Sequence, residues 1–145
     1  MLFKSLSMGE LCLTQSRADR AMHSVVTKQL EPFRLTMMEW LVLVVVSGGS
    51  KEGLSMTRIA NALDVTLPQV TALVTTLLHQ KLVNQKTLET DRRGRQVNVT
   101  LRGRRTLAKL ESSIASALNE WSGHVSEERM REYVETVELL SQNAE

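Results

Sequence analysis

Lysine and arginine side chains are concentrated in one short stretch of the sequence, between two runs that alternate like β-strands. Residues 82–105 contain seven Lys or Arg and only two acids, although the whole chain has a formal net charge of +2. Residues 106–145 contain eight acids and three bases. So strong a local positive charge favours an anionic partner, such as the phosphate backbone of a nucleic acid. The basic residues are Lys86, Arg92, Arg93, Arg95, Arg102, Arg104 and Arg105.

Residues that could perform catalysis or hold a metal are scattered along the chain. The three histidines, His23, His79 and His124, are far apart, and the sequence has neither a His-Glu-x-x-His motif nor a phosphate-binding glycine loop. Cys12 is the single cysteine, which excludes a disulfide within the chain and a cysteine-based zinc site. The sequence therefore predicts a protein that is not an enzyme and that needs no cofactor or metal.

Composition indicates an ordinary globular chain with an aliphatic core. Of the 145 residues 42% are hydrophobic and 23% charged, but only 3% are aromatic. The longest apolar run, residues 40–46, is far shorter than the roughly 20 residues that cross a bilayer. With a single cysteine, a reducing compartment is the natural location. We expect a cytoplasmic protein without a membrane partner.

Two helix starts can be located from their capping residues. Thr36 and Glu39 form a capping box before an apolar run that could otherwise be a buried strand, so we expect a fully buried helix ending at residues 47–49. Thr66 and Gln69 form a second capping box, with Pro68 in the first turn of the helix that follows. Between the two, a short helix is expected after residue 55.

The remaining periodicities complete a winged arrangement. The second capped helix has one apolar stripe, while residues 82–88 and the alternation at Val97, Val99 and Leu101 predict two strands joined by a hairpin tip at 89–95. Longer helices are expected at 8–30, at 101–121 and after residue 126. The predicted fold is mostly α, a winged helix-turn-helix with flanking dimerisation helices. The stripe consists of Val70, Leu73, Val74, Leu77 and Leu78.

The segments LTMMEWLVL and TRIANALDVTLPQVTALVTTLLHQKLV resemble the second helix and the helix-turn-helix of the MarR family of bacterial transcription regulators. The segment DRRGRQVNVTLRGRR is similar to the family's wing, an Asp-x-Arg-Gly turn followed by a strand that ends in Thr-x-x-Gly. The resemblance covers nearly the whole chain. It implies an N-terminal dimerisation helix (1–34), a DNA-binding domain (35–105) and C-terminal dimerisation helices (106–145).

The resemblance also implies a DNA-contacting surface. Asp91 would hold an arginine in place and Arg93 would reach DNA. Residues 66–76 would form the recognition helix of a homodimer on a pseudo-palindromic double-stranded operator. The residues expected to contact DNA are Thr66, Pro68, Gln69, Thr71, Ala72, Thr75 and Thr76 in the helix, and Asp91, Arg92, Arg93 and Arg95 in the wing.

Three residues depart from the family pattern. Ala72 and Thr76 stand where arginine is common, so base recognition would depend on polar side chains and on contacts with thymine methyl groups. The wing would then supply most of the electrostatic affinity. Lys81 replaces a glycine at the end of the recognition helix, and a positive φ there would cost roughly 1 kcal/mol.

The function that the resemblance implies is a dimeric regulator, acting as a repressor, which a small apolar or aromatic ligand releases from its operator. Wall residues of such a ligand pocket would be Met22, His23, Met37, Met38 and Trp40, although we expect most of these to be dimer core instead. A winged-helix interaction module that does not bind DNA is a further alternative.

A redox-sensing regulator acting through Cys12 is another alternative. The turns around Cys12 offer no group that would favour a thiolate, and the only tyrosine, Tyr133, is distant in sequence. We therefore expect Cys12 to be a small core hydrophobe and the ligand to be the regulator.

Overall fold

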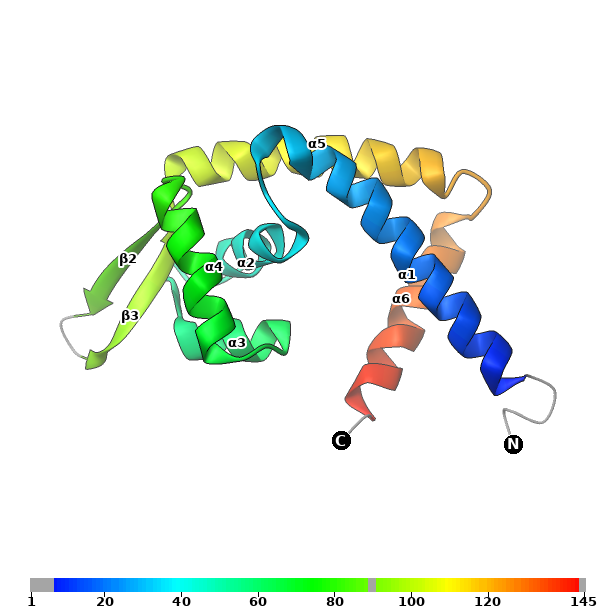
Figure 1. Cartoon of the computed structure of the whole chain (residues 1–145), viewed down its shortest axis with the longest axis horizontal. Coiled ribbons are helices and arrows are strands. Elements are labelled where there is room, and N and C mark those ends of the chain that lie inside the picture. The colour runs from blue at the N-terminus through cyan, green and yellow to red at the C-terminus, as the bar shows by residue number, and fades with distance from the viewer. Residues whose placement is uncertain (1–6, 89–90, 144–145) are drawn as a thin grey trace.

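The chain forms a helical arch, with a small winged domain at one end and an arm of helices at the other (Figure 1). The structure is a computed structural model that describes residues 7–88 and 91–143. We call residues 35–105 the winged domain, and residues 8–22 together with 115–142 the arm. The elements in order are α1 (Met8–Leu30), η1 (Glu31–Phe33), α2 (Met37–Ser47), β1 (Leu54–Ser55), α3 (Met56–Leu63), α4 (Leu67–His79), β2 (Val83–Leu88), β3 (Asp91–Val99), α5 (Leu101–Trp121) and α6 (Glu127–Gln142).

Both predicted capping boxes are present. At the start of α2 the Thr36 amide donates to Glu39 over 2.9 Å, and the Glu39 amide donates to the Thr36 hydroxyl over 3.2 Å. At the start of α4 the same pair of bonds joins Thr66 and Gln69, at 2.9 and 3.4 Å. Helix α2 is not fully buried as expected, because Val44 is 39% exposed. An entirely apolar helix sequence does not indicate which side its neighbours leave uncovered.

A three-stranded antiparallel sheet of order β1-β3-β2 forms the wing and its base. Val97, which is fully buried, lies opposite Leu54 on one side and Gln85 on the other. Strand β3 begins at Asp91, inside the predicted hairpin tip, and the pairing with β2 shifts between Thr87 and Leu88. The alternation in β3 ends at Val99.

Leu101 does not continue that strand. It is the first residue of α5 and is 58% exposed. The helix begins there because Thr100 caps it by accepting a hydrogen bond from the Gly103 amide over 3.0 Å. Helix α5 then runs without a break from the winged domain into the arm, so the expected boundary at residue 105 falls inside one helix. The three-part division of the chain stays a prediction.

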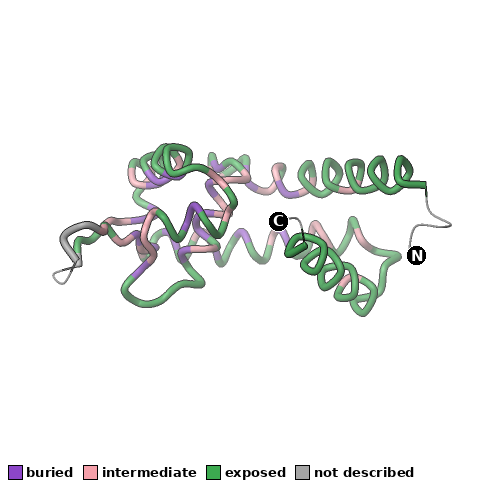
Figure 2. The backbone as a smooth tube through the Cα atoms, turned by 90° about the horizontal axis from the view of Figure 1, so that it is seen from below, coloured by how far each residue is buried: buried purple, intermediate pink, exposed green. Residues whose placement is uncertain are grey.

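The hydrophobic core lies in the winged domain and in the first half of α5, as the distribution of buried residues in Figure 2 shows. The predicted stripe on α4 faces this core: Val70, Val74 and Leu77 are at most 1% exposed. The other fully buried large side chains come from the winged domain and from the parts of α1 and α5 that pack on it. They include Leu30, Leu43, Ile59 and Leu110.

The arm is packed more loosely. Just outside the arm, helices α1 and α5 lie against each other, and the Ser113 hydroxyl donates to the Gln29 side chain between them. In α6 every residue is exposed except the partly buried Met130. None of the helices in the described ranges is long and apolar enough to cross a membrane.

Candidate nucleic-acid interface

The outer face of α4 is exposed, uncharged and lined by small side chains. It lies opposite the buried stripe and consists of two rows, and within each row successive residues are four positions apart. Neither row contains a charged residue, and the first basic residue after Thr66 is Lys81. The rows are Leu67, Thr71 and Thr75, and Pro68, Ala72 and Thr76. All the α4 residues expected to contact DNA are therefore accessible.

A hydrogen-bonded junction joins the end of α4 to the base of the wing. The Lys81 amide donates to the Leu78 carbonyl over 2.9 Å and the Leu82 amide to the Leu77 carbonyl over 3.0 Å, which is a Schellman end. Lys81 has a φ of 60°, a positive value that glycine adopts more easily than lysine. The Thr100 hydroxyl then donates to the Lys81 carbonyl over 2.7 Å. These bonds fix where the wing begins relative to α4.

Gly103 brings α5 against this junction. A Cβ atom at that position would lie 2.1 Å from the Leu82 carbonyl oxygen and 2.6 Å from a methyl group of Val99. Only a residue without a side chain lets the helix approach so closely. The Thr-x-x-Gly motif therefore has a structural reason that the sequence pattern alone did not reveal.

The wing carries two exposed basic side chains below its tip, Lys86 and Arg95, on paired strands. The side chains of Asp91, Arg92 and Arg93 lie outside the part of the chain that the structure describes, so their expected roles stay predictions. Arg95 pairs in register with Thr87, directly before the shift in the ladder. The arginine-rich segment is thus part of the hairpin.

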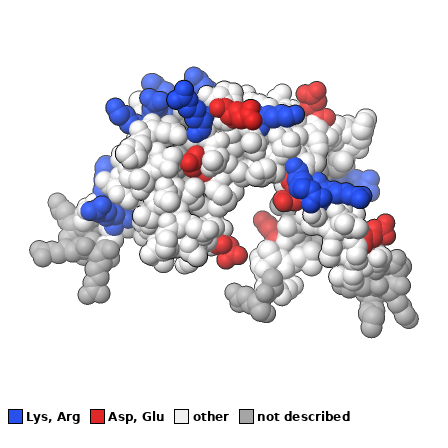
Figure 3. Space-filling model, viewed as in Figure 1, with Lys and Arg blue, Asp and Glu red and all other residues white. Residues whose placement is uncertain are grey.

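The start of α5 extends the basic surface. Arg102, Arg104 and Arg105 are all exposed, and the Arg104 guanidinium also donates to the Val99 carbonyl over 3.3 Å. Lys and Arg side chains gather over this region and the base of the wing, and the surface over α4 is mostly uncharged (Figure 3). Among the side chains that the structure describes, the one ion pair is far away, between Arg131 and Glu127 on α6. The exposed side chains of Lys86, Arg95, Arg102 and Arg105 are accessible to an external anion.

Solved structures share this arrangement, although no family model matches the chain. A MarR family transcriptional regulator from Rhodococcus sp. RHA1 superposes with a TM-score of 0.82 at 22% identity, over 94% of this chain and 96% of that one. CouR from Rhodococcus jostii RHA1, bound to p-coumaroyl-CoA, gives 0.84 at 20% identity, over 97% and 99%. The chain has the MarR fold.

Another similar structure is a MarR family protein of Mycobacterium tuberculosis in complex with salicylic acid. It has a TM-score of 0.68 and 22% identity, with 94% of this chain and 98% of that chain covered. The expected fold class, a mostly α winged helix-turn-helix with flanking helices, is confirmed at this level. Both ligand-bound structures cover nearly the whole chain, so the similarity includes the arm as well as the wing.

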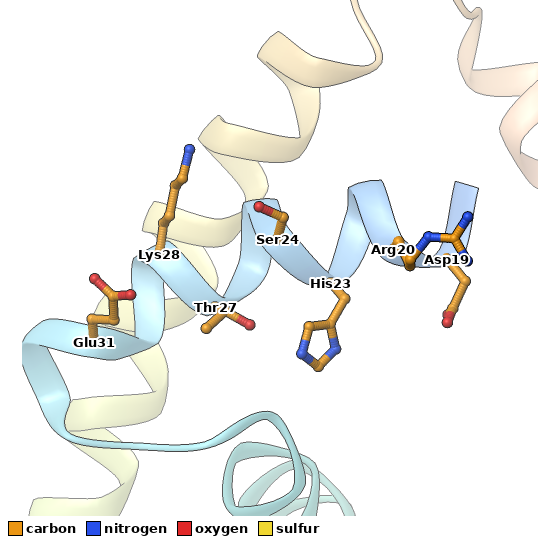
Figure 4. Close-up of a pocket in the computed structure, with 7 residues that line it drawn as sticks. All are labelled: Asp19, Arg20, His23, Ser24, Thr27, Lys28 and Glu31. Carbon is orange, nitrogen blue, oxygen red and sulfur yellow. The ribbon is translucent and has the colours of Figure 1, made fainter. Parts of the chain in front are cut away.

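Within this MarR fold the five expected pocket residues are not gathered in one cavity. His23 lines a hollow of about 470 Å³ on α1, formed with Thr27 and five other residues, and its side chain extends away from that of Lys28 (Figure 4). Met22 lines a separate apolar hollow of about 310 Å³ between α1 and the arm residues Trp121 and Tyr133. The other three expected residues belong to α2.

Those α2 residues are partly buried. Met37 and Trp40 pack against the core, and Met38 is half-buried beside them in sequence. The Trp40 indole nitrogen is buried and has no hydrogen-bond partner among the described residues, and the same is true of the Thr27 hydroxyl. Of these two groups only the Thr27 hydroxyl belongs to the hollow that His23 lines. A buried polar atom without a hydrogen-bond partner is uncommon.

Cys12 is exposed, which corrects the expectation that it is a core residue. It lines an open groove of about 650 Å³ between α1 and α6, together with Leu11, Val137 and Leu140. Tyr133 is remote in sequence but close in space, because its hydroxyl donates to Gln15, one turn beyond Cys12, over 3.4 Å. Distance along the sequence was a poor guide here because α6 returns alongside α1.

Metal-binding chemistry has no candidate in the described residues. No group of three or more His, Cys, Asp or Glu residues there could hold a metal ion.

Proposed function

We propose that the chain is a homodimeric, DNA-binding transcriptional repressor. Each subunit would place α4 in a major groove and its wing along the neighbouring backbone and minor groove. The observation that carries this proposal is the hydrogen-bonded junction at Lys81 and Thr100, which holds an exposed helix and a basic hairpin in one rigid unit. The MarR-type fold supports it.

The second subunit is inferred from the arm. Its helices expose large apolar side chains that a single chain leaves in contact with water, including Met8, Leu13, Val134, Leu139 and Leu140. Burial of these residues against a two-fold related copy would remove the apolar surface. We expect the interface to exceed the ~1,600 Å² that is typical of stable complexes.

Selection of bound fragments from random duplex DNA tests the proposal directly. We expect a pseudo-palindrome whose half-sites are about one helical turn apart, and binding that weakens as salt rises. Failure to bind any duplex at low salt would contradict it and would favour the winged-helix interaction module. A single unpaired half-site would contradict the dimer alone.

We further infer that a small apolar or aromatic molecule regulates DNA binding. The hollow at His23 and the unsatisfied Thr27 hydroxyl that lines it support an effector that also forms hydrogen bonds. The two similar proteins bound to p-coumaroyl-CoA and salicylic acid give the class of probe to try first. Such a molecule releases DNA only if it binds the two states of the dimer with different affinities.

The effector test uses a panel of aromatic acids, with salicylate as the first probe, in a DNA-release titration. We expect His23→Ala to change the concentration needed for release without abolishing DNA binding. His124→Ala, a histidine outside this hollow, is the matched control and should behave as the wild type. The inference would be contradicted if no aromatic probe released the DNA.

A second candidate is regulation by peroxide through Cys12, which is exposed in the single chain and lies one turn from Gln15, the hydrogen-bond partner of Tyr133. Oxidation of the thiol to a sulfenic acid would then release DNA. Mild peroxide treatment of the wild type and of Cys12→Ser separates the candidates. Release in the wild type alone supports the redox candidate, and release in neither protein excludes it.

A further inference from the structure

The outer face of α4 offers methyl groups and hydroxyl oxygens in place of positive charge. From Thr66 to Gln80 the chain has no Lys or Arg, so α4 lacks the side chains that most often recognise guanine in the major groove. What this face can recognise depends on which of its hydrogen-bonding groups are still free, and the structure specifies them.

The three outward threonines use their hydroxyl protons inside the helix. Thr71 donates to the Leu67 carbonyl over 2.9 Å, Thr75 to the Thr71 carbonyl over 2.7 Å, and Thr76 to the Ala72 carbonyl over 3.2 Å. A hydroxyl whose proton is bound in this way can still accept a hydrogen bond, but it no longer donates one. Because these residues are exposed, each presents an acceptor oxygen and a methyl group to a partner.

Gln69 is restricted in the opposite sense. Its side-chain oxygen accepts hydrogen bonds from the Thr66 amide over 2.9 Å and from the Thr66 hydroxyl over 3.0 Å. The side-chain NH₂ group remains free to donate. Gln69 therefore cannot form the two-bond contact with adenine that needs both its oxygen and its nitrogen while the cap is intact.

These groups match one kind of base pair. An A·T pair presents the thymine methyl, an adenine amino donor, and acceptors on both bases, whereas a G·C pair has no methyl group. We propose that α4 selects A·T pairs through contacts between the methyl groups of Thr71, Thr75 and Thr76 and thymine methyl groups, with the threonine oxygens accepting from adenine. This specificity rests on the proposed DNA-binding function.

The methyl contacts are tested by removing methyl groups from the DNA. In the selected duplex, thymines of the half-sites are replaced one at a time by uracil, which lacks only the methyl group. We expect affinity to fall about fourfold at each contacted position, the factor that burial of one methyl-sized group corresponds to. Replacement of thymines outside the half-sites should leave affinity unchanged.

Variants of Thr75 then identify the protein partner of one such methyl. Thr75→Ser keeps the hydroxyl and loses the methyl, so it should bind thymine and uracil duplexes equally at one position. Thr75→Val keeps a methyl and should retain the preference for thymine. Thr136→Ser is the matched control, because Thr136 on α6 makes the same bond to the carbonyl four residues earlier, over 2.7 Å. The Thr136→Ser variant should discriminate between thymine and uracil duplexes as the wild type does.

The outcomes separate this inference from the function on which it rests. A selected site with G·C half-sites, or affinity that uracil leaves unchanged at every position, would overturn the A·T specificity while DNA binding stands. Equal discrimination by Thr75→Ser and the wild type, together with the same result for Thr71→Ser and Thr76→Ser, would overturn the assignment to these methyls. Absence of binding to any duplex would instead overturn the proposed function.

Discussion

The winged domain and the arm both contain aliphatic and charged residues but are stabilised differently. In the winged domain large side chains such as Leu43, Ile59 and Leu77 are fully buried within one chain. In the arm Val134, Leu139 and Leu140 are at least half exposed. The comparison indicates that the winged domain buries its own apolar side chains, whereas the arm requires a partner to bury them.

Side-chain hydrogen bonds between elements occur in both regions, such as Thr100 to Lys81 in the winged domain and Tyr133 to Gln15 in the arm. The exposed apolar surface is therefore what distinguishes the arm. Substitutions in the arm should affect assembly, and substitutions in the winged domain should affect folding and DNA binding. Four sets of variants test that division, from the largest expected effect to the smallest.

The largest effect is expected in the arm, for the double variant Val137→Asp and Leu140→Asp. Both residues line the groove between α1 and α6, so charges there should prevent association. Light scattering at micromolar concentration should show a monomer, and operator affinity should fall about a hundredfold or more because a monomer engages only one half-site. The control Glu138→Gln, on the same helix, should remain dimeric. If the double variant were still a dimer, the assignment of the arm as the dimer interface would be contradicted.

Gly103→Ala should destabilise the winged domain, because the new Cβ would lie 2.1 Å from a backbone oxygen. We expect the free energy of unfolding to fall by about 1–3 kcal/mol, the usual range for overpacking. Urea denaturation at fixed protein concentration measures it. Gly9→Ala is the matched control in the first turn of α1, where the nearest atom is 3.8 Å away. It should be neutral or stabilising, and equal decreases in the two variants would refute the close-approach explanation.

Arg93→Ala should weaken binding to every DNA sequence without changing which sequence is preferred. The reason is that a wing arginine would neutralise phosphate charge, so the slope of log affinity against log salt should decrease by about one for each phosphate that is no longer neutralised. Gln69→Ala should instead alter sequence preference. Arg131→Ala, on α6, is the control for a general reduction in positive charge. An unchanged slope for Arg93→Ala would contradict the assignment of the wing to the DNA interface.

The smallest effect is expected at Lys81, whose φ of 60° favours glycine. Lys81→Gly should raise the free energy of unfolding by about 1 kcal/mol by relieving that strain. His79→Gly, two residues earlier at the end of α4, should lower it by a similar amount because glycine is a poor helix former. Thermal or urea denaturation measures both, and destabilisation by Lys81→Gly would show that the lysine side chain has another role.

The sequence predicted the order and extent of nearly all the elements. The capping residues Thr36 and Thr66 located two helix starts to the residue, and the Val70, Val74, Leu77 stripe identified the buried side of α4. Such signals are local, because a cap or a stripe depends only on residues within one or two turns. The helix expected from Leu101 is present, although the strand alternation also included that residue. The same locality explains this overlap and the error at Val44, because neither pattern contains information on where neighbouring elements pack.

What the sequence determined by itself was therefore the helix-turn-helix, the basic hairpin and the charge difference between wing and C-terminal helices. Only the tertiary structure placed Tyr133 near Cys12, separated Met22 from His23, and gave Gly103 its reason in the Leu82 carbonyl. It also showed that the hydroxyl protons of Thr71, Thr75 and Thr76 are already bound. These facts depend on atoms that different turns or elements bring together, and residue spacing along one element contains no information about that approach.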